Sequence, residues 1–353
     1  MFVESPPEPS AGPTAAPDKP APPRRHAVRA AGLLAALVLL VLVCLASIGI
    51  GAKALPLADV WHGLFHYAGS SDDVLVRKVR IPRTVLGLIV GSALGLAGAV
   101  MQALTRNPLA EPGLLGVNAG ASAAVVSAIS FFGVTSLTGY VWFAFAGAAI
   151  VSVAVYLLGG SRSATPVRLA LAGTAVTAAL YGYVNAVQLL DSAALDRLRF
   201  WTVGSLASAN TETVGKVWPF IAIGVVLTLL IARPLNALEM GDDTARALGA
   251  HLTRTRVLAM LAVTLLCGAA TAACGPIVFI GLMIPHLVRV ITGPDMRWIL
   301  PYAAVLSPVL LLGADVVGRI IARPAELQVG IVTALIGGPV FIHLVRRKRM
   351  SQL

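Results

Sequence analysis

Asp315 and Arg319 are ionisable residues in an otherwise apolar stretch, and buried carboxylates of this kind can relay protons across a membrane. A carboxylate at the centre of a spanning helix costs roughly 2.5–3.5 kcal/mol on insertion scales. Arg319 follows Asp315 by four residues, so both side chains share one helical face and can form an intramembrane ion pair. No other apolar run holds a carboxylate that would receive a proton. We therefore favour a structural pair near the outer helix end over a proton relay.

Three histidines are candidates for metal binding or catalysis. His62 and His66 are four residues apart, a spacing that suits a metal on a helix face, but no third ligand lies nearby. We interpret them as residues of an interfacial loop. An intramembrane enzyme would need a nucleophile or a metal set within the spans, and His286 is the single suggestive histidine there. A structural role at an inner helix end is the better interpretation of His286.

Motifs for catalysis and nucleotide binding are missing. The sequence contains no GxxxxGK[ST] loop, no GxSxG and no HExxH. The chain is therefore predicted to be no enzyme and to bind no cofactor itself. If the chain transports a solute, it must take energy from another subunit or move that solute down its gradient.

The composition predicts a polytopic all-α membrane protein. Of the 353 residues, 57% are hydrophobic and 12% are charged, against about 25% charged in soluble domains. Mean hydropathy is +0.85. The apolar runs are uniform and about 20 residues long, as spanning helices require, without the alternation of membrane strands. The three cysteines lie in or beside apolar runs, and neither a disulfide nor a metal site is expected.

Ten apolar runs are expected to span the membrane in a single transmembrane domain over residues 30–353. They are 30–52, 84–104, 114–132, 140–158, 167–190, 214–232, 254–273, 277–291, 298–321 and 329–345. The eighth contains Pro285 and is expected to be broken or kinked. Residues 1–29 hold eight prolines among small residues, so we expect a disordered cytoplasmic tail.

The distribution of basic residues sets the orientation. With ten spans both termini share a side, and that side carries 17 of the 27 Lys and Arg residues. The positive-inside rule therefore predicts cytoplasmic termini in the plasma or inner membrane. The net charge of +11 is a topology signal and indicates no nucleic-acid partner. The outer face is nevertheless basic, which favours an acidic partner docking from outside.

A glycine stripe and a long inner loop predict contact surfaces. Gly87, Gly91 and Gly95 are four residues apart, so they share one face on which a neighbouring helix can approach closely. In the inner loop 233–256, Gly241 can end one short helix, Asp242 and Asp243 suit the start of a second, and Gly249 suits its end. Such a helix–turn–helix is a candidate docking surface, with a solvated linker as the alternative.

Short motifs along most of the chain resemble the FecCD (cobalamin permease-like) family, the permeases of ABC importers for iron–siderophore, haem and cobalamin. Each motif is weak alone, and the resemblance depends on their order and spacing. They are 80–83, 91–98 with Gln102, 106–112, 115–116 with 120–121, 169–173, 200–201 with 204–206, 245–246 with 248–249, 275–286, 314–315, Glu326 with 329–330, and 338–339 with Phe341.

The resemblance implies a type II ABC importer permease fold with ten helices, working as a homodimer or with a paralogous permease. Its second to fifth and seventh to tenth spans would be inverted repeats. Two cytoplasmic ATPase subunits would bind ATP and magnesium and contact the coupling-helix position. That position consists of Leu238, Glu239, Met240, Gly241, Asp242, Asp243, Ala245, Arg246, Leu248 and Gly249.

The resemblance also implies a docking surface and a gate. A substrate-binding (lipo)protein would dock outside on arginines that match the family positions Arg80, Arg83 and Arg319. The cytoplasmic gate would lie at two turns, of which the second has only one of the family's usual small hydroxyl residues, Thr165. The gate residues are Asn107, Leu109, Thr165, Pro166 and Val167.

The implied cargo is a ferric siderophore, with haem or cobalamin as the alternative. Large chelates need a wide passage with weak walls, and the spans offer Ala, Gly, Ser and Thr rather than charge. An ion-coupled secondary transporter is a more distant alternative. It would need buried carboxylates at mid-span, and Asp315 is the single candidate in the sequence.

Overall fold

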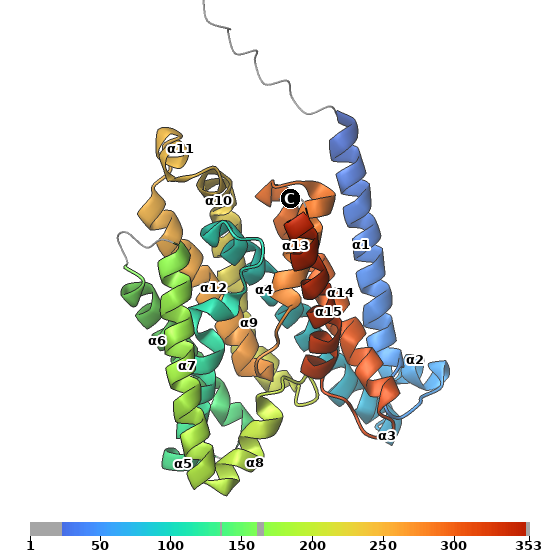
Figure 1. Ribbon diagram of the computed structural model, residues 1–353. Helices are drawn as coiled ribbons and strands as arrows, with labels where there is room; N and C mark the ends of the chain where they lie inside the picture. Colours follow the sequence, from blue (N-terminus) through green and yellow to red (C-terminus); the bar gives the residue numbers. More distant parts are fainter. Residues whose placement is uncertain (1–22, 135, 161–165, 351–353) are drawn as a thin grey trace, which may run out of the picture.

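The computed structural model describes residues 23–350 except 135 and 161–165, and its regular structure in that part of the chain is entirely helical (Figure 1). The elements are α1 (Pro23–Gly49), α2 (Leu57–Phe65), α3 (Ser71–Val74), η1 (Leu75–Arg80), α4 (Ile81–Thr105), η2 (Pro112–Leu115), α5 (Val117–Phe132), α6 (Leu137–Leu158), α7 (Pro166–Leu190), α8 (Ser192–Trp201), α9 (Thr211–Leu230), α10 (Ala232–Glu239), α11 (Asp242–Ala247), α12 (Leu252–Cys274), α13 (Ile280–Thr292), α14 (Met296–Ile321) and α15 (Val329–Met350).

The apolar helices agree with the ten spans expected from the sequence. Within the described residues, seven helices are long and apolar enough to cross a membrane, and α5, α13 and α15 are shorter apolar helices. The short helices α2 and α8 were not anticipated. They carry fewer apolar residues in a row than a span requires, so hydropathy alone does not reveal them.

Two boundaries differ from the sequence-based expectation. Helix α1 begins at Pro23, within the segment 1–29 that was expected to be a tail, and residues 1–22 lie outside the described residues. Proline is tolerated in a first helical turn, where its missing N–H has no helical acceptor in any case. Helix α13 continues through Pro285, and the chain is irregular before it, from Gly275 to Phe279. The interruption thus precedes the proline that was expected to cause it.

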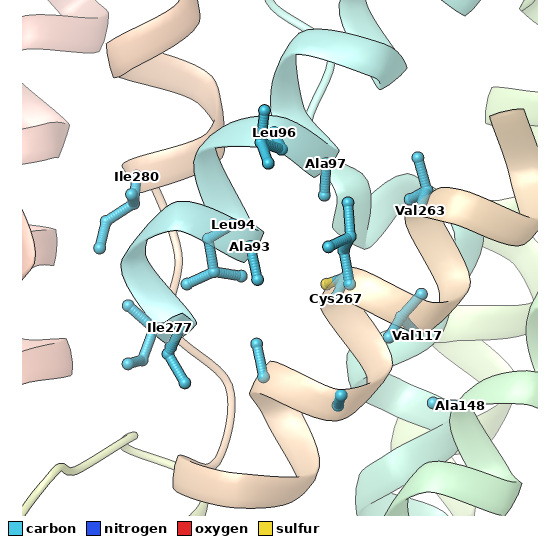
Figure 2. Packing of buried hydrophobic residues seen from close by; sticks show 14 of the residues in the cluster. Ala93, Leu94, Leu96, Ala97, Val117, Ala148, Val263, Cys267, Ile277 and Ile280 are labelled. Carbon is cyan, nitrogen blue, oxygen red and sulfur yellow. The ribbon is translucent and has the colours of Figure 1, made fainter. Parts of the chain in front are cut away.

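Helix α4 is the centre of the bundle. It packs against α14, α12, α13 and α9, and 78% of its most apolar window is buried, against 11% for α1 at the periphery. Figure 2 shows how Ala93 and Leu94 of α4 face Ile277 and Ile280, while Cys267 of α12 lies on the other side. The core therefore joins α4 to the start of α13 and to α12.

Side-chain caps fix the ends of several helices. Ser136 accepts a hydrogen bond from the Gly139 N–H at the start of α6, and Asn210 accepts one from Thr213 at the start of α9. Asp191 caps α8 through the N–H groups of residues 193 and 194. Each cap satisfies an amide that has no partner within its helix.

The molecule has two distinct ends. Helices α10 and α11 lie at the end where α1 begins and where the C-terminus is marked (Figure 1). Helices α2, α3 and α8 lie at the opposite end (Figure 1). We call these the α10–α11 end and the α2–α8 end. An even number of crossings explains why both ends of the described chain lie on one side.

Candidate functional site

The glycine stripe of α4 forms the contact with α14. A Cβ added at Gly91 would lie 2.5 Å from the Pro308 Cα, and one added at Gly95 would lie 2.7 Å from the Ala303 carbonyl oxygen. At Gly87 an added Cβ would overlap the side chain of Leu312. Because no larger residue fits, these glycines allow α4 and α14 to touch backbone to backbone.

Asp315 lies in a buried ion-pair network near the α2–α8 end. Arg83 donates to both of its carboxylate oxygens, at 2.7 Å from Nη2 and 3.0 Å from Nε, and donates to Glu326 at 2.6 Å. Arg319 pairs with the Asp315 carboxylate at 3.1 Å. Asp315 is fully buried, so two guanidinium groups compensate one carboxylate where unpaired charge is most costly.

Arginines also hold the end of α1. Arg80 donates to the carbonyl oxygens of residues 48, 49 and 53, Arg319 donates to the Ser47 carbonyl at 3.0 Å, and Arg323 donates to the Gly51 carbonyl at 2.8 Å. The last carbonyl groups of a helix lack helical partners and carry partial negative charge. Three guanidinium groups therefore anchor the end of an otherwise peripheral helix at the α2–α8 end of the molecule.

These contacts bear on the predicted docking arginines. Arg80, Arg83 and Arg319 are 3%, 5% and 1% exposed, and each donates to acceptors within the chain. In this conformation the three guanidinium groups lie inside the protein and are not available to a docking partner. Exposed basic residues at the same end include Lys78 and Arg323. Docking through the three buried arginines therefore stays a prediction.

The described residues among those predicted for the gate lie at the α10–α11 end. Asn107 begins a turn after α4, where its side-chain oxygen accepts from the Leu109 N–H at 3.0 Å. Arg106 just before it adopts a left-handed conformation, with φ of 51°, which ends α4 sharply. Pro166 begins α7, Val167 is 67% exposed, and Thr165 lies outside the described residues. The structure thus places the first turn in full and the second in part.

The loop 233–256 is folded as two short helices, and the alternative of a solvated linker is wrong. Helix α10 ends at Glu239, Gly241 turns the chain with φ of 106°, α11 follows, and Gly249 reverses the chain with φ of 78°. Leu238 and Ala245 are buried against the bundle. Met240 and Leu248 are 57% and 61% exposed, so this pair of helices presents apolar side chains outward.

Carboxylates of α10 and α11 are ion-paired with arginines on three other helices. Asp242 contacts Arg106 at the end of α4 at 3.0 Å and Arg256 of α12 at 2.8 Å. Glu239 contacts Arg289 of α13 at 2.7 Å. A displacement of α10 and α11 would therefore pull directly on α4, α12 and α13.

Helix α14 is joined to α10 by hydrogen bonds of the Asn236 side chain. Asn236 donates to the Asp295 carboxylate at 2.9 Å and accepts from the Met296 N–H at 2.8 Å. A cavity of about 260 Å³ lies at the Glu239–Arg289 ion pair and is lined by Gln102, Arg106, Pro108, Glu239 and Arg289. The turn after α4 and the α10–α11 helices thus share one solvent-accessible space.

Glu111 is a partly buried carboxylate that sequence reasoning missed. It lies in the loop after α4, outside the apolar runs, and accepts a hydrogen bond from the Phe279 N–H at 3.0 Å. Phe279 has a φ of 71°, and this amide begins α13. The bond joins the two irregular segments that follow Asn107 and Gly275. Irregular backbone at membrane depth needs such internal partners.

The candidate metal ligands do not assemble into a site. Within the described residues, no three His, Cys, Asp or Glu side chains are grouped for a metal ion. His62 lies 3.1 Å from the carboxylate of Asp73, which also accepts from the N–H groups of residues 68 and 70. His62 therefore contributes to the local structure beside α2.

Comparison with known proteins identifies the family. The FecCD transport family matches residues 39–347. The chain belongs to this family. The ferric enterobactin transport system permease protein of Escherichia coli (strain K12) is 48% identical over 322 residues, covering 91% of this chain and 96% of the relative. The Fe(3+)-citrate import system permease protein of Bacillus subtilis (strain 168) is 39% identical over 326 residues, covering 92% and 97%.

A solved structure agrees with the FecCD assignment. An inward-facing metal-chelate type ABC transporter matches with a TM-score of 0.79 and 29% identity, over 89% of this chain and 98% of that chain. The fold predicted from the sequence is thereby confirmed. The chain is a multi-pass membrane permease subunit of an ABC importer. Its membership of an ABC importer implies ATPase and binding-protein partners.

Proposed function

We propose that this FecCD permease imports ferric siderophores across the cytoplasmic membrane. The observation that carries the proposal is the 48% identity to a ferric enterobactin permease over nearly its whole length. Within the described residues, the spanning helices place few charges at membrane depth, and Asp315 is held by two arginines. A passage with such walls would release a large chelate instead of binding it tightly. The binding protein would then select the cargo.

The α10–α11 end faces the cytoplasm in this proposal. Most of the Lys and Arg residues that the structure describes belong to that end, as the positive-inside rule requires of cytoplasmic loops. Two ATPase subunits would contact α10 and α11, where Met240 and Leu248 offer exposed apolar side chains. ATP and magnesium would bind in those subunits.

The ion pairs of Asp242 and Glu239 would transmit the ATPase movement. When the ATPases close, α10 and α11 would shift and draw the ends of α4, α12 and α13 with them. Asn107 and Leu109 follow directly after α4, so the gate turn would move with Arg106. Val167 at the start of α7 would form the opposing part of the gate.

A binding protein would dock at the α2–α8 end, and a second permease, identical or paralogous, would complete the passage. Exposed Lys78 and Arg323 would attract acidic residues of the binding protein in this conformation. Arg80, Arg83 and Arg319 would reach it only after the buried network opens. Helix α7, whose most apolar window is 17% buried, leaves a large apolar surface for the second permease.

Growth and uptake in a deletion strain test the cargo. We expect loss of the gene to abolish uptake of radiolabelled iron from ferric enterobactin or another siderophore and to leave haem and cobalamin use intact. The opposite pattern, loss of haem or cobalamin uptake with normal siderophore uptake, would contradict the proposed cargo. Restoring the gene should restore uptake in either case.

A further inference from the structure

An apolar groove runs between α6 and α12 on the outside of the bundle. Its volume is about 240 Å³, and the residues that shape it include Val153 and Tyr156 of α6 and Val257 and Leu261 of α12. Val153, Val257 and Leu261 are 57%, 45% and 45% exposed, so the groove opens away from the core. Because both helices are candidate spans, the groove lies at membrane depth.

The groove has a closed end and an open end. Beyond Thr264, the helices approach at Gly268, where an added Cβ would lie 3.4 Å from the Ala148 Cβ and 3.5 Å from the Phe145 ring. Toward the α10–α11 end the lining of the groove ends at Val257, five residues after α12 begins at Leu252. Ser152 lines it with a hydroxyl group that is buried and lacks a hydrogen-bond partner. The groove therefore lies along the half of α12 that is nearer the α10–α11 end.

A positive charge lies at the open end. Arg254 precedes Val257 by three residues and Leu261 by seven, so the three side chains share one face of α12. Arg254 is exposed and forms no ion pair with any residue that the structure describes. The N-cap residue of α12, His251, makes no side-chain capping bond. The free amides of this first turn and the guanidinium group both favour an anion.

We propose that the groove binds one acyl chain of an anionic phospholipid, with its phosphate on Arg254. The apolar walls suit a hydrocarbon chain, and the charge at the surface end suits the phosphate. Under the proposed orientation, the lipid belongs to the cytoplasmic leaflet.

Lipid binding is tested on the complex of the permease and its ATPase in nanodiscs. Native mass spectrometry would compare retention of phosphatidylglycerol and phosphatidylcholine with identical acyl chains. Arg254→Gln is expected to reduce the preference for phosphatidylglycerol about fivefold, the factor that corresponds to ~1 kcal/mol per basic residue near an anionic surface. The matched control is Arg297→Gln, which removes another exposed arginine at the same end and should leave the preference unchanged.

A second variant tests the groove itself. Val153→Trp fills the groove from α6 and should reduce retention of both lipids, while leaving Arg254 in place. Unchanged retention in Val153→Trp, or an unchanged phosphatidylglycerol preference in Arg254→Gln, would overturn the proposal. Disulfide formation between copies carrying cysteine at position 153 would also overturn it, because a second permease would then cover the groove.

Discussion

Arg83 and Asp315, 232 residues apart in the sequence, are joined by two short hydrogen bonds in the interior of the protein. The pair connects α4 to α14 on the side of their glycine contact that is nearer the α2–α8 end. Arg319 adds a second cation to the same carboxylate. The α4–α14 interface thus combines close backbone packing with a buried charge network.

Removing the shared carboxylate should destabilise the permease strongly. Asp315→Ala leaves Arg83 and Arg319 buried without their common anion, and loss of one partner from a buried pair costs about 3–5 kcal/mol. We expect a large fall in the melting temperature of the purified protein. Asp196→Ala is the matched control, because its pair with Arg199 is exposed and worth little. Equal melting temperatures for both variants would contradict the network's structural role.

The glycine contact predicts a position-specific effect of one methyl group. Gly91→Ala would place a Cβ 2.5 Å from the backbone of Pro308 and force α14 to move, at a cost of about 1–3 kcal/mol. Gly313→Ala on α14 would meet nothing within 4 Å and should be neutral or stabilising. Chemical unfolding of the two variants measures the difference. If both behave alike, α4 and α14 are not in backbone contact.

Asp242 is expected to couple ATP hydrolysis to transport. Asp242→Asn weakens the contacts of α11 with Arg106 and Arg256 while keeping the side chain's shape. Transport per ATP hydrolysed should fall several-fold in reconstituted vesicles, with the ATPase still bound. Asp243→Asn is the control, because that fully exposed side chain is ion-paired only with Arg246 of α11 among the residues that the structure describes. A normal ratio in Asp242→Asn would show that the movement passes by another route.

The cap of α8 predicts a pH dependence at the α2–α8 end. A hydrogen bond from Ser130, followed by those from the Ala194 and Ala193 amides, lowers the pKa of Asp191. The ionised Asp191 side chain therefore stabilises the folded protein above the unfolded-state pKa of about 3.9. This stabilisation is lost as the pH falls through the lower folded-state pKa.

Hydrogen exchange measures this effect. The amides of α8 should exchange faster, relative to the intrinsic rate, as the pH falls below about 4. Asp191→Asn should remove this pH dependence, and Ser130→Ala should move its midpoint toward the ordinary value for aspartate. Protection of α8 that is independent of pH in the unchanged protein would show that the carboxylate does not stabilise the cap.

Sequence patterns predicted the apolar helices well, since hydropathy and length decide them. The turn at Gly241 and the pairing of Asp315 with Arg319 were also predictable, because glycine conformation and four-residue spacing are local properties. The main partner of Asp315, Arg83, was not, because it comes from the other half of the chain. Motif position assigned Arg83 to an outer surface, whereas the packing of α4 on α14 places it in the interior.

Contacts between distant segments account for the other omissions. Nothing in the loop sequence around Glu111 indicates its partner. The hydrogen bond that it accepts from the Phe279 N–H shows that the loop after α4 meets the irregular segment before α13. The ion pairs of Glu239 and Asp242 likewise join four separate parts of the chain. One sequence does not specify such pairs, because any of its many arginines is a chemically acceptable partner.

The central claim is that this permease moves cargo only when driven by separate subunits. The most direct measurement is uptake of a ferric siderophore into sealed vesicles containing the permease, with and without its ATPase, binding protein and ATP. We predict accumulation against a gradient only when all components are present. Accumulation by the permease alone would contradict the account and would indicate an ion-coupled transporter.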